Sequence, residues 1–217
     1  LKILMKHIYC ISGFGADERV FSKLDFGDNQ VHYLSWLLPF STENIEAYAK
    51  RMAEKILHPN PILFGLSFGG MMVLEISKLI NTDKVIIISS IKSRTELPFW
   101  MRIAGKLKLD KIFPMRSFSL IEPLENYNLG IENEDERKLV NSYRKNVSQA
   151  YTNWAIHKIL NWKNEWQPAN LSHIHGRNDH IFPLKYIKAD YIIKDGGHFM
   201  IMNRNKKVNE ILSSFWL

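Results

Sequence analysis

The segment 65–69 has the sequence GLSFG and contains the residue types of a serine nucleophile turn. It follows the apolar run 61–64 and precedes the helical pattern 68–80. A nucleophilic serine at a sharp strand-to-helix turn needs small residues two positions away, because bulkier neighbours collide in such a tight bend. The following helix directs free N–H groups toward the developing negative charge. We therefore predict Ser67 as a nucleophile; the alternative is a glycine-rich turn in which Ser67 only caps the helix.

Two later loops supply an acid and a base for such a nucleophile. Asp179 ends the stretch HGRND (175–179), which follows a predicted strand, and His198 ends the stretch GGH (196–198) after another. A serine needs a basic imidazole to take its proton, and that imidazole needs a carboxylate to orient it. Along the chain these three residues occur in the order Ser, Asp, His.

Other polar side chains admit competing interpretations. Asp195 is close to the predicted base but is expected to support its own loop, and Glu75 is expected to be a solvated or packing residue of the nucleophile helix. His173, His175 and His180 raise the possibility of a metal site. No carboxylate or cysteine completes a recognised ligand spacing there, so packing in the strand and turn is the preferred interpretation.

Alternating strand and helix patterns predict the elements that would position these residues. The predicted strands are 7–11, 31–34, 61–64, 84–89, 171–175 and 190–193. The predicted helices include 43–57, with Ser41 or Thr42 as its N-cap, 68–80, 134–145 and 204–215. Such alternation is typical of a mostly parallel sheet with helices on both faces. The segment 93–165 breaks the alternation and is predicted to be a helical insertion.

Taken together, these motifs resemble those of the α/β-hydrolase superfamily, in its compact, lid-bearing serine esterase or thioesterase type. The resemblance covers nearly the whole chain. It implies a catalytic triad of Ser67, Asp179 and His198. It also implies an oxyanion hole formed by the backbone N–H groups of Phe14 and Phe68, since an early strand of the family leads into a loop that donates one of them.

The chain departs from the family pattern in several ways, among them the absence of the common glycine-rich loop after the second predicted strand. The early loop has Ser12 where the family usually has histidine, which changes how the loop is braced. The family's first two antiparallel strands are absent, so the resemblance implies a sheet of about six strands. We expect one α/β-hydrolase domain over residues 1–217, with a helical cap insertion at about 93–165.

The expected activity is hydrolysis of a carboxylic ester or thioester of a small or medium acyl substrate through an acyl-enzyme. The predicted substrate-binding residues are Phe14, Trp36, Phe99, Trp100 and Phe113. Substitutions in the insertion at the last three positions are expected to shift acyl-chain preference. A carbon–carbon hydrolase or lyase with the same triad, or a non-catalytic ligand-binding protein, remains as an alternative.

Composition limits the other function classes. The formal net charge of +7 is not accompanied by a nucleic-acid-binding motif, so a small-molecule partner is expected and nucleic acid is not. No apolar stretch approaches the roughly 20 residues of a membrane span. The single cysteine, Cys10, excludes an internal disulfide and favours a cytoplasmic location. No cofactor or metal is expected for the reaction, and the oligomeric state is left open.

Overall fold

A parallel sheet forms the centre of the protein in the computed structural model, which describes residues 5–112 and 122–216. Within these residues the six strands are β1 (His7–Ile11), β2 (Gln30–Tyr33), β3 (Ile62–Leu66), β4 (Lys84–Ile88), β5 (Leu171–Gly176) and β6 (Tyr191–Ile193). Their order across the sheet is β2-β1-β3-β4-β5-β6, and every neighbouring pair is parallel. The predicted strands agree with these bounds to within two residues, so the predicted fold class is confirmed.

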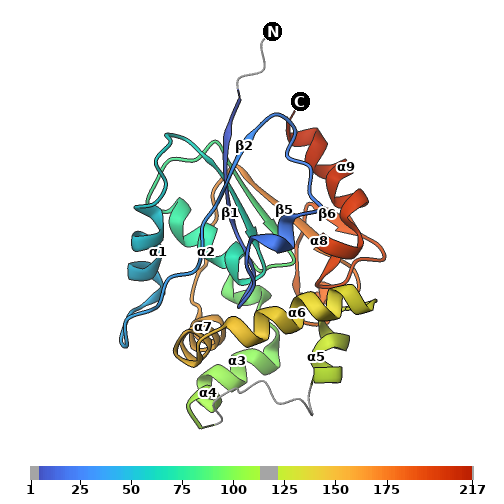
Figure 1. The fold of residues 1–217 in the computed structure, drawn as a ribbon. Helices are drawn as coiled ribbons and strands as arrows, with labels where there is room; N and C mark the ends of the chain where they lie inside the picture. The colour runs from blue at the N-terminus through green and yellow to red at the C-terminus, as the bar shows by residue number, and fades with distance from the viewer. Residues whose placement is uncertain (1–4, 113–121, 217) are drawn as a thin grey trace.

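Alternate residues of the central strands enter two separate hydrophobic layers. On β1, Tyr9 and Ile11 belong to one buried cluster, and Ile8 and Cys10 belong to the other. All five residues of β3 are buried, as expected for a parallel strand covered on both faces. Helices α1 (Ile45–Ala53) and α2 (Phe68–Ser77) cover one face, and α8 (Met200–Asn203) and α9 (Asn205–Trp216) cover the other (Figure 1).

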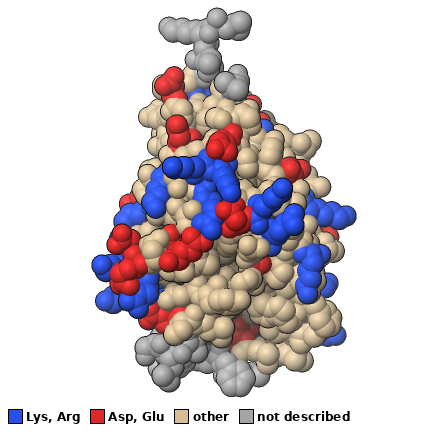
Figure 2. All heavy atoms as spheres, turned by 90° about the vertical axis from the view of Figure 1, so that its right-hand side faces the viewer, with Lys and Arg blue, Asp and Glu red and all other residues tan. Residues whose placement is uncertain are grey.

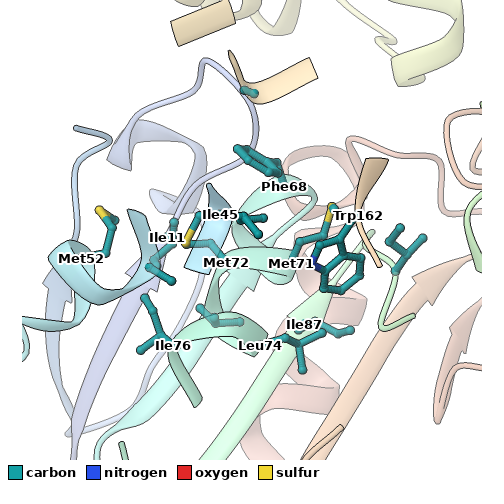
Figure 3. Close-up of a cluster of buried hydrophobic side chains, with 14 of the residues drawn as sticks. Ile11, Ile45, Met52, Phe68, Met71, Met72, Leu74, Ile76, Ile87 and Trp162 are labelled. Carbon is teal, nitrogen blue, oxygen red and sulfur yellow. The ribbon is translucent and has the colours of Figure 1, made fainter. Parts of the chain in front are cut away.

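Helix α2 is apolar on every side because it is enclosed by other elements. Figure 3 shows its side chains between those of α1 and those of the sheet, with Met72 near Ile45 and Leu74 near Ile87. Nine of its ten residues are buried. The predicted nucleophile turn that precedes this helix is therefore anchored in the hydrophobic core.

Helix α1 begins later than its sequence pattern indicated. Asn44 is its N-cap, and the Asn44 side chain accepts the N–H of Ala47 at 2.7 Å. The prediction that Ser41 or Thr42 caps this helix was wrong, because a cap must lie next to the first helical residue to reach its free N–H groups.

The connection between β4 and β5 is helical, as predicted. Its described elements are α3 (Phe99–Lys106), α4 (Leu109–Ile112), α5 (Glu122–Leu129), α6 (Glu134–Asn146) and α7 (Gln149–Asn161). These helices gather at one end of the sheet, where the parallel strands have their carboxyl ends (Figure 1). This is the edge at which ligands bind in open α/β sheets. Among the described residues, no helix is long and apolar enough to cross a membrane.

Candidate active site

Ser67 lies at a strained turn between β3 and α2. Its φ and ψ are +52° and −118°, a conformation that residues with a side chain rarely adopt. A Cβ atom added at Gly65 would lie 2.4 Å from the carbonyl oxygen of Gly69, and one added at Gly69 would lie 2.2 Å from that of Ile11. The backbone is thus too close for a side chain at either glycine, which is the steric requirement inferred from the sequence.

The three predicted triad residues form one chain of hydrogen bonds. His198 Nε2 lies 3.0 Å from Ser67 Oγ, and His198 Nδ1 lies 2.8 Å from Asp179 Oδ2. Since a carboxylate only accepts hydrogen bonds, Nδ1–H donates to Asp179 and Nε2 is left to accept the serine proton. Asp179 and His198 are 2% and 6% exposed, whereas Ser67 is half-buried. This arrangement can deprotonate a serine that a small molecule can reach.

The Asp179 carboxylate is held from both sides. Its Oδ1 accepts the backbone N–H groups of Ile181 and Phe182, each at 2.8 Å, so Oδ2 is directed to His198. His175 lies against the same carboxylate, with its Nε2 3.6 Å from Asp179 Oδ2 and 2.8 Å from the Phe182 carbonyl oxygen. Burial lowers the pKa of His175, because it disfavours the charged form of the ring.

The sequence interpretation assigned His175 to packing in the strand and turn, and the structure adds its contact with the Asp179 carboxylate. The available signal was its position four residues before Asp179, at the end of β5. His173, on the same strand, is also fully buried, and burial lowers its pKa too. His180, next to Asp179 in the chain, is exposed, and its ring lies 4.7 Å from that of Tyr127 of α5 in a tilted arrangement.

The competing carboxyl groups have other partners. Asp195 is exposed and pairs with Arg204 Nε at 2.9 Å and with Lys207 Nζ at 2.6 Å. Glu75 is buried, and its Oε1 accepts the indole N–H of Trp162 at 2.7 Å. Asp179 therefore remains the carboxylate that contacts the histidine.

The two predicted oxyanion-hole residues flank the serine. Phe68 is the first residue of α2, where the helix leaves backbone N–H groups without an intrahelical partner. The loop that carries Phe14 passes close to the nucleophile, because a Cβ added at the preceding Gly13 would lie 3.4 Å from Ser67 Cβ. Both predicted donors are thus on segments adjacent to Ser67.

Two side chains brace the Phe14 loop. Ser12 Oγ donates to the carbonyl oxygen of Ala16 at 2.6 Å and closes the loop from within. Trp36 Nε1 donates to the carbonyl oxygen of Gly13 at 3.2 Å, and its ring stacks on Phe68 at 5.0 Å. Trp36 therefore links the two segments that carry the predicted oxyanion donors.

The helical insertion contacts segments on both sides of the predicted triad. Tyr151 of α7 stacks on Phe14 at a ring distance of 5.9 Å. At the other side, the carbonyl oxygen of Leu129, at the end of α5, accepts the N–H of Phe199 beside the base at 2.9 Å. The insertion thus borders the oxyanion loop and the histidine loop together.

A cavity of about 270 Å³ adjoins the oxyanion loop. Its wall includes Ser12, Trp36, Val147 and Tyr151, but Ser67 is not part of it. Trp36 and Tyr151 both line this wall, and their rings lie 5.5 Å apart. Tyr151 also stacks on Phe14 of the oxyanion loop. The cavity therefore lies beside the site, on the oxyanion side.

The remaining predicted substrate-binding residues are placed differently. Phe99 and Trp100 of α3 are 60% and 57% exposed, and the ring contacts of the described residues join neither of them to the triad. Phe113 lies outside the described residues. Of the predicted set, the structure brings Phe14 and Trp36 to the site.

Positively and negatively charged side chains are mixed on the face that Figure 2 shows. Lys and Arg side chains alternate there with Asp and Glu rather than forming one continuous basic surface. Elsewhere in the described residues, opposite charges pair directly, as in the group formed by Glu132, Asp195, Arg204 and Lys207. This face has no extended basic stripe of the kind that follows a nucleic-acid backbone.

Comparison with known proteins shows similarity in structure but not in sequence. No family model matches the chain, and no curated protein matches it. An esterase from Thermogutta terrifontis superposes with a TM-score of 0.71 at 15% identity, covering 97% of this chain and 89% of the esterase. An epoxide hydrolase from Bacillus megaterium gives a TM-score of 0.69 at 14% identity over 97% and 93% of the two chains.

A third solved structure has another activity. It is an N-acyl homoserine lactonase complexed with N-butanoyl homoserine, with a TM-score of 0.68 at 14% identity over 99% of this chain and 89% of the lactonase. At such low identities the likeness concerns the fold, which supports different chemistries. These structures share the parallel sheet and flanking helices described above, and the chain therefore has the α/β-hydrolase fold.

Proposed function

We propose that this chain is a serine hydrolase that cleaves a carboxylic ester or thioester of a small or medium acyl substrate. The observation that carries the proposal is the continuous hydrogen-bond chain from Ser67 Oγ through His198 to Asp179, with distances of 3.0 and 2.8 Å. If Ser67 only capped the helix, it would need neither the buried His198 ring beside it nor the Asp179 carboxylate that contacts that ring. The strained conformation of Ser67 adds support, because such strain is typical of nucleophile turns.

The proposed reaction has two stages. Ser67 Oγ attacks the substrate carbonyl carbon while His198 Nε2 takes the serine proton, and the same proton then passes to the departing alcohol or thiol. This forms an acyl-enzyme. In the second stage His198 takes a proton from water as the water oxygen attacks the acyl carbon. The bond between Ser67 Oγ and the acyl carbon then breaks, the carboxylic acid leaves, and the proton on His198 returns to Ser67 Oγ. Asp179 holds Nδ1–H throughout and stabilises the charged imidazole.

Backbone donors supply the stabilisation of the oxyanion. In this proposal the N–H groups of Phe14 and Phe68 bind the carbonyl oxygen once it becomes negative, each contributing about 3–4 kcal/mol. Trp36 keeps the two donor segments together through its bond to Gly13 and its stack on Phe68.

We propose that the acyl group packs against Trp36, Phe14 and Tyr151. These rings lie beside the oxyanion loop, and two of them form part of the wall of the 270 Å³ cavity. Each buried methylene is worth about 0.8 kcal/mol, so a few methylenes suffice to set a chain-length preference. In this proposal the segment 93–165 is a cap on a single hydrolase domain, and α7 is its selective part.

Fluorophosphonate labelling tests the nucleophile. The probe should label the wild type and fail to label Ser67→Ala, while Ser213→Ala, at an exposed serine of α9, should label like the wild type. Undiminished labelling of Ser67→Ala would exclude Ser67 as the nucleophile.

A substrate panel tests the bond that is cleaved. It should include chromogenic esters of increasing acyl length, acyl-CoA thioesters and a lactone, which is a cyclic ester. Turnover of any of these that is lost in Ser67→Ala supports the proposal. Labelling of Ser67 without turnover of any of them would favour carbon–carbon hydrolysis or lyase chemistry, and absence of both would favour a non-catalytic binder.

The acyl subsite is tested by comparing two aromatic positions. Tyr151→Leu should change the ratio of kcat/KM between long and short esters, whereas Trp100→Leu, on the exposed face of α3, should leave that ratio unchanged. The opposite result would favour the sequence-based prediction, in which Phe99 and Trp100 select the acyl chain.

A further inference from the structure

Three histidines gather at the end of the sheet opposite the insertion. His7 begins β1, His32 lies on the edge strand β2, and His58 lies in the connection between α1 and β3. The start of β1 is at the opposite end of the sheet from α3–α7 (Figure 1). One ring nitrogen from each histidine lies within 4.8 Å of the other two. The proposed hydrolase site is at the carboxyl end of β3, so this cluster is separate from it.

The three rings are in close contact with one another. His7 Nδ1 lies 3.1 Å from His32 Nε2, and the rings of His7 and His58 are stacked at 3.4 Å. A neutral imidazole keeps the lone pair that a metal ion requires.

We propose that His7, His32 and His58 bind one divalent transition-metal ion, with Zn²⁺ as the reference ion. In a tetrahedral site with Zn–N bonds of about 2.0–2.1 Å, two ligand nitrogens are about 3.3–3.4 Å apart. The His7–His32 nitrogen distance of 3.1 Å is close to this value. The third nitrogen lies within 4.8 Å of the other two, and the His58 ring must turn out of its stack on His7 to bring it to the ion. All three histidines are half-buried, so an ion can reach them from solvent and a water molecule can take the fourth position.

Tyr9 supplies the outer contact that metal-binding histidines usually have. Its hydroxyl oxygen lies 2.7 Å from His58 Nδ1 and accepts the backbone N–H of Leu57 at 3.0 Å. When His58 Nδ1–H donates to the same oxygen, its Nε2 is left as the free ligand nitrogen. Tyr9 is buried and packs on His32 at a ring distance of 4.6 Å, so it also holds a second ligand in place.

The bound ion would join three segments that are far apart in the sequence. It would link β1, β2 and the connection that leads into β3, all on the side of the sheet that bears α1. Because the folded chain brings the ligands together and the unfolded chain does not, binding should stabilise the fold. This is a structural site in the proposal, and it takes no part in ester cleavage.

Isothermal titration of the full, untagged chain with ZnCl₂ after removal of metals by a chelator tests the proposal. The wild type should bind one ion per chain saturably at pH 7.5. His32→Gln and His58→Gln should each weaken binding at least tenfold. The matched control is His180→Gln, at an exposed histidine outside the cluster, which should bind like the wild type.

Two further measurements separate a built site from incidental binding by histidines. Tyr9→Phe keeps the ring but removes the hydroxyl, and it should weaken Zn²⁺ binding about 10–100-fold. Zn²⁺ should raise the Tm of the wild type and of His180→Gln, but not that of His32→Gln. Absence of saturable binding by the wild type, or equal binding by the wild type and both cluster variants, would overturn the proposal. The titrations use folded variants, checked by circular dichroism, and the wild-type result decides alone if a variant does not fold.

Discussion

Replacing Asp179 with asparagine would change one atom of the side chain and reverse one hydrogen bond. Two backbone N–H groups, those of Ile181 and Phe182, point at Oδ1 at 2.8 Å, so the asparagine oxygen must occupy that position. The asparagine NH₂ group then faces His198 Nδ1, where the wild type has an acceptor at 2.8 Å. His198 must place its proton on Nε2 to avoid two facing donors. Nε2–H then points at Ser67 and cannot take the serine proton.

The expected loss follows from this change of tautomer. Reversal of the tautomer lowers kcat by about 10³–10⁴-fold in a triad of this kind. This corresponds to about 4–5.5 kcal/mol in the activation free energy. Asp179→Asn should therefore retain its fold, because the backbone hydrogen bonds to Oδ1 survive, but lose nearly all turnover of a short chromogenic ester. Steady-state kinetics would measure the loss, and ¹⁵N NMR of the histidine ring would report the tautomer.

Asp195→Asn is the matched control for this prediction. Asp195 is a loop carboxylate near the base, but it pairs with Arg204 and Lys207 at the surface. Exposed ion pairs are worth little, about 0–1 kcal/mol, so this variant should keep its kcat within about threefold of the wild type. A larger loss in Asp195→Asn than in Asp179→Asn, with both variants folded, would refute the assignment of the acid.

Three further predictions concern stability and reactivity. Gly69→Ala should lower the free energy of unfolding by about 3 kcal/mol in urea titrations, because its Cβ would lie 2.2 Å from the backbone oxygen of Ile11; an unchanged unfolding midpoint would contradict this. Glu43→Gln should cost about 1–3 kcal/mol at pH 7, since Arg51 donates to both Glu43 oxygens at 2.7 Å. Burial raises the pKa of Glu43, but the hydrogen bonds from Arg51 and a backbone N–H outweigh it and hold the pKa below its ordinary value. The difference in unfolding free energy between the wild type and Glu43→Gln should therefore be full above the ordinary pKa of a glutamate. It should fade as the pH falls through the lower pKa that Glu43 has in the folded protein. A difference that does not change with pH would count against this cause. Cys10 is buried, and burial raises the pKa of its thiol. A disulfide reagent should therefore modify Cys10 only at urea concentrations that unfold the protein. Rapid labelling of the native protein would contradict the buried position of Cys10.

Local patterns in the sequence were sufficient for the six strands, for the helices α1, α2, α6 and α9, and for naming the three candidate triad residues. These elements span 3 to 13 residues, and the spacing of their apolar residues can be recognised without knowing the rest of the fold. The GLSFG turn and the two loops after later strands could be identified because parallel strands carry their carboxyl ends to one edge. The cap of α1 was misplaced because polar residues before a helix are interchangeable until the first helical turn is known.

Side-chain neighbours from distant segments were decided only by the tertiary structure. Ser67 and His198 are 131 positions apart, and their 3.0 Å contact depends on strand order and on the packing of two loops. The exposure of Trp100 and the bond from Trp36 to the oxyanion loop depend likewise on how α3 and the segment after β2 pack. The pairing of β1 with β2 brings His7 and His32 together across 25 positions. A sequence pattern records which face of its own element a residue occupies, whereas contact between elements depends on register and packing, which no local pattern contains.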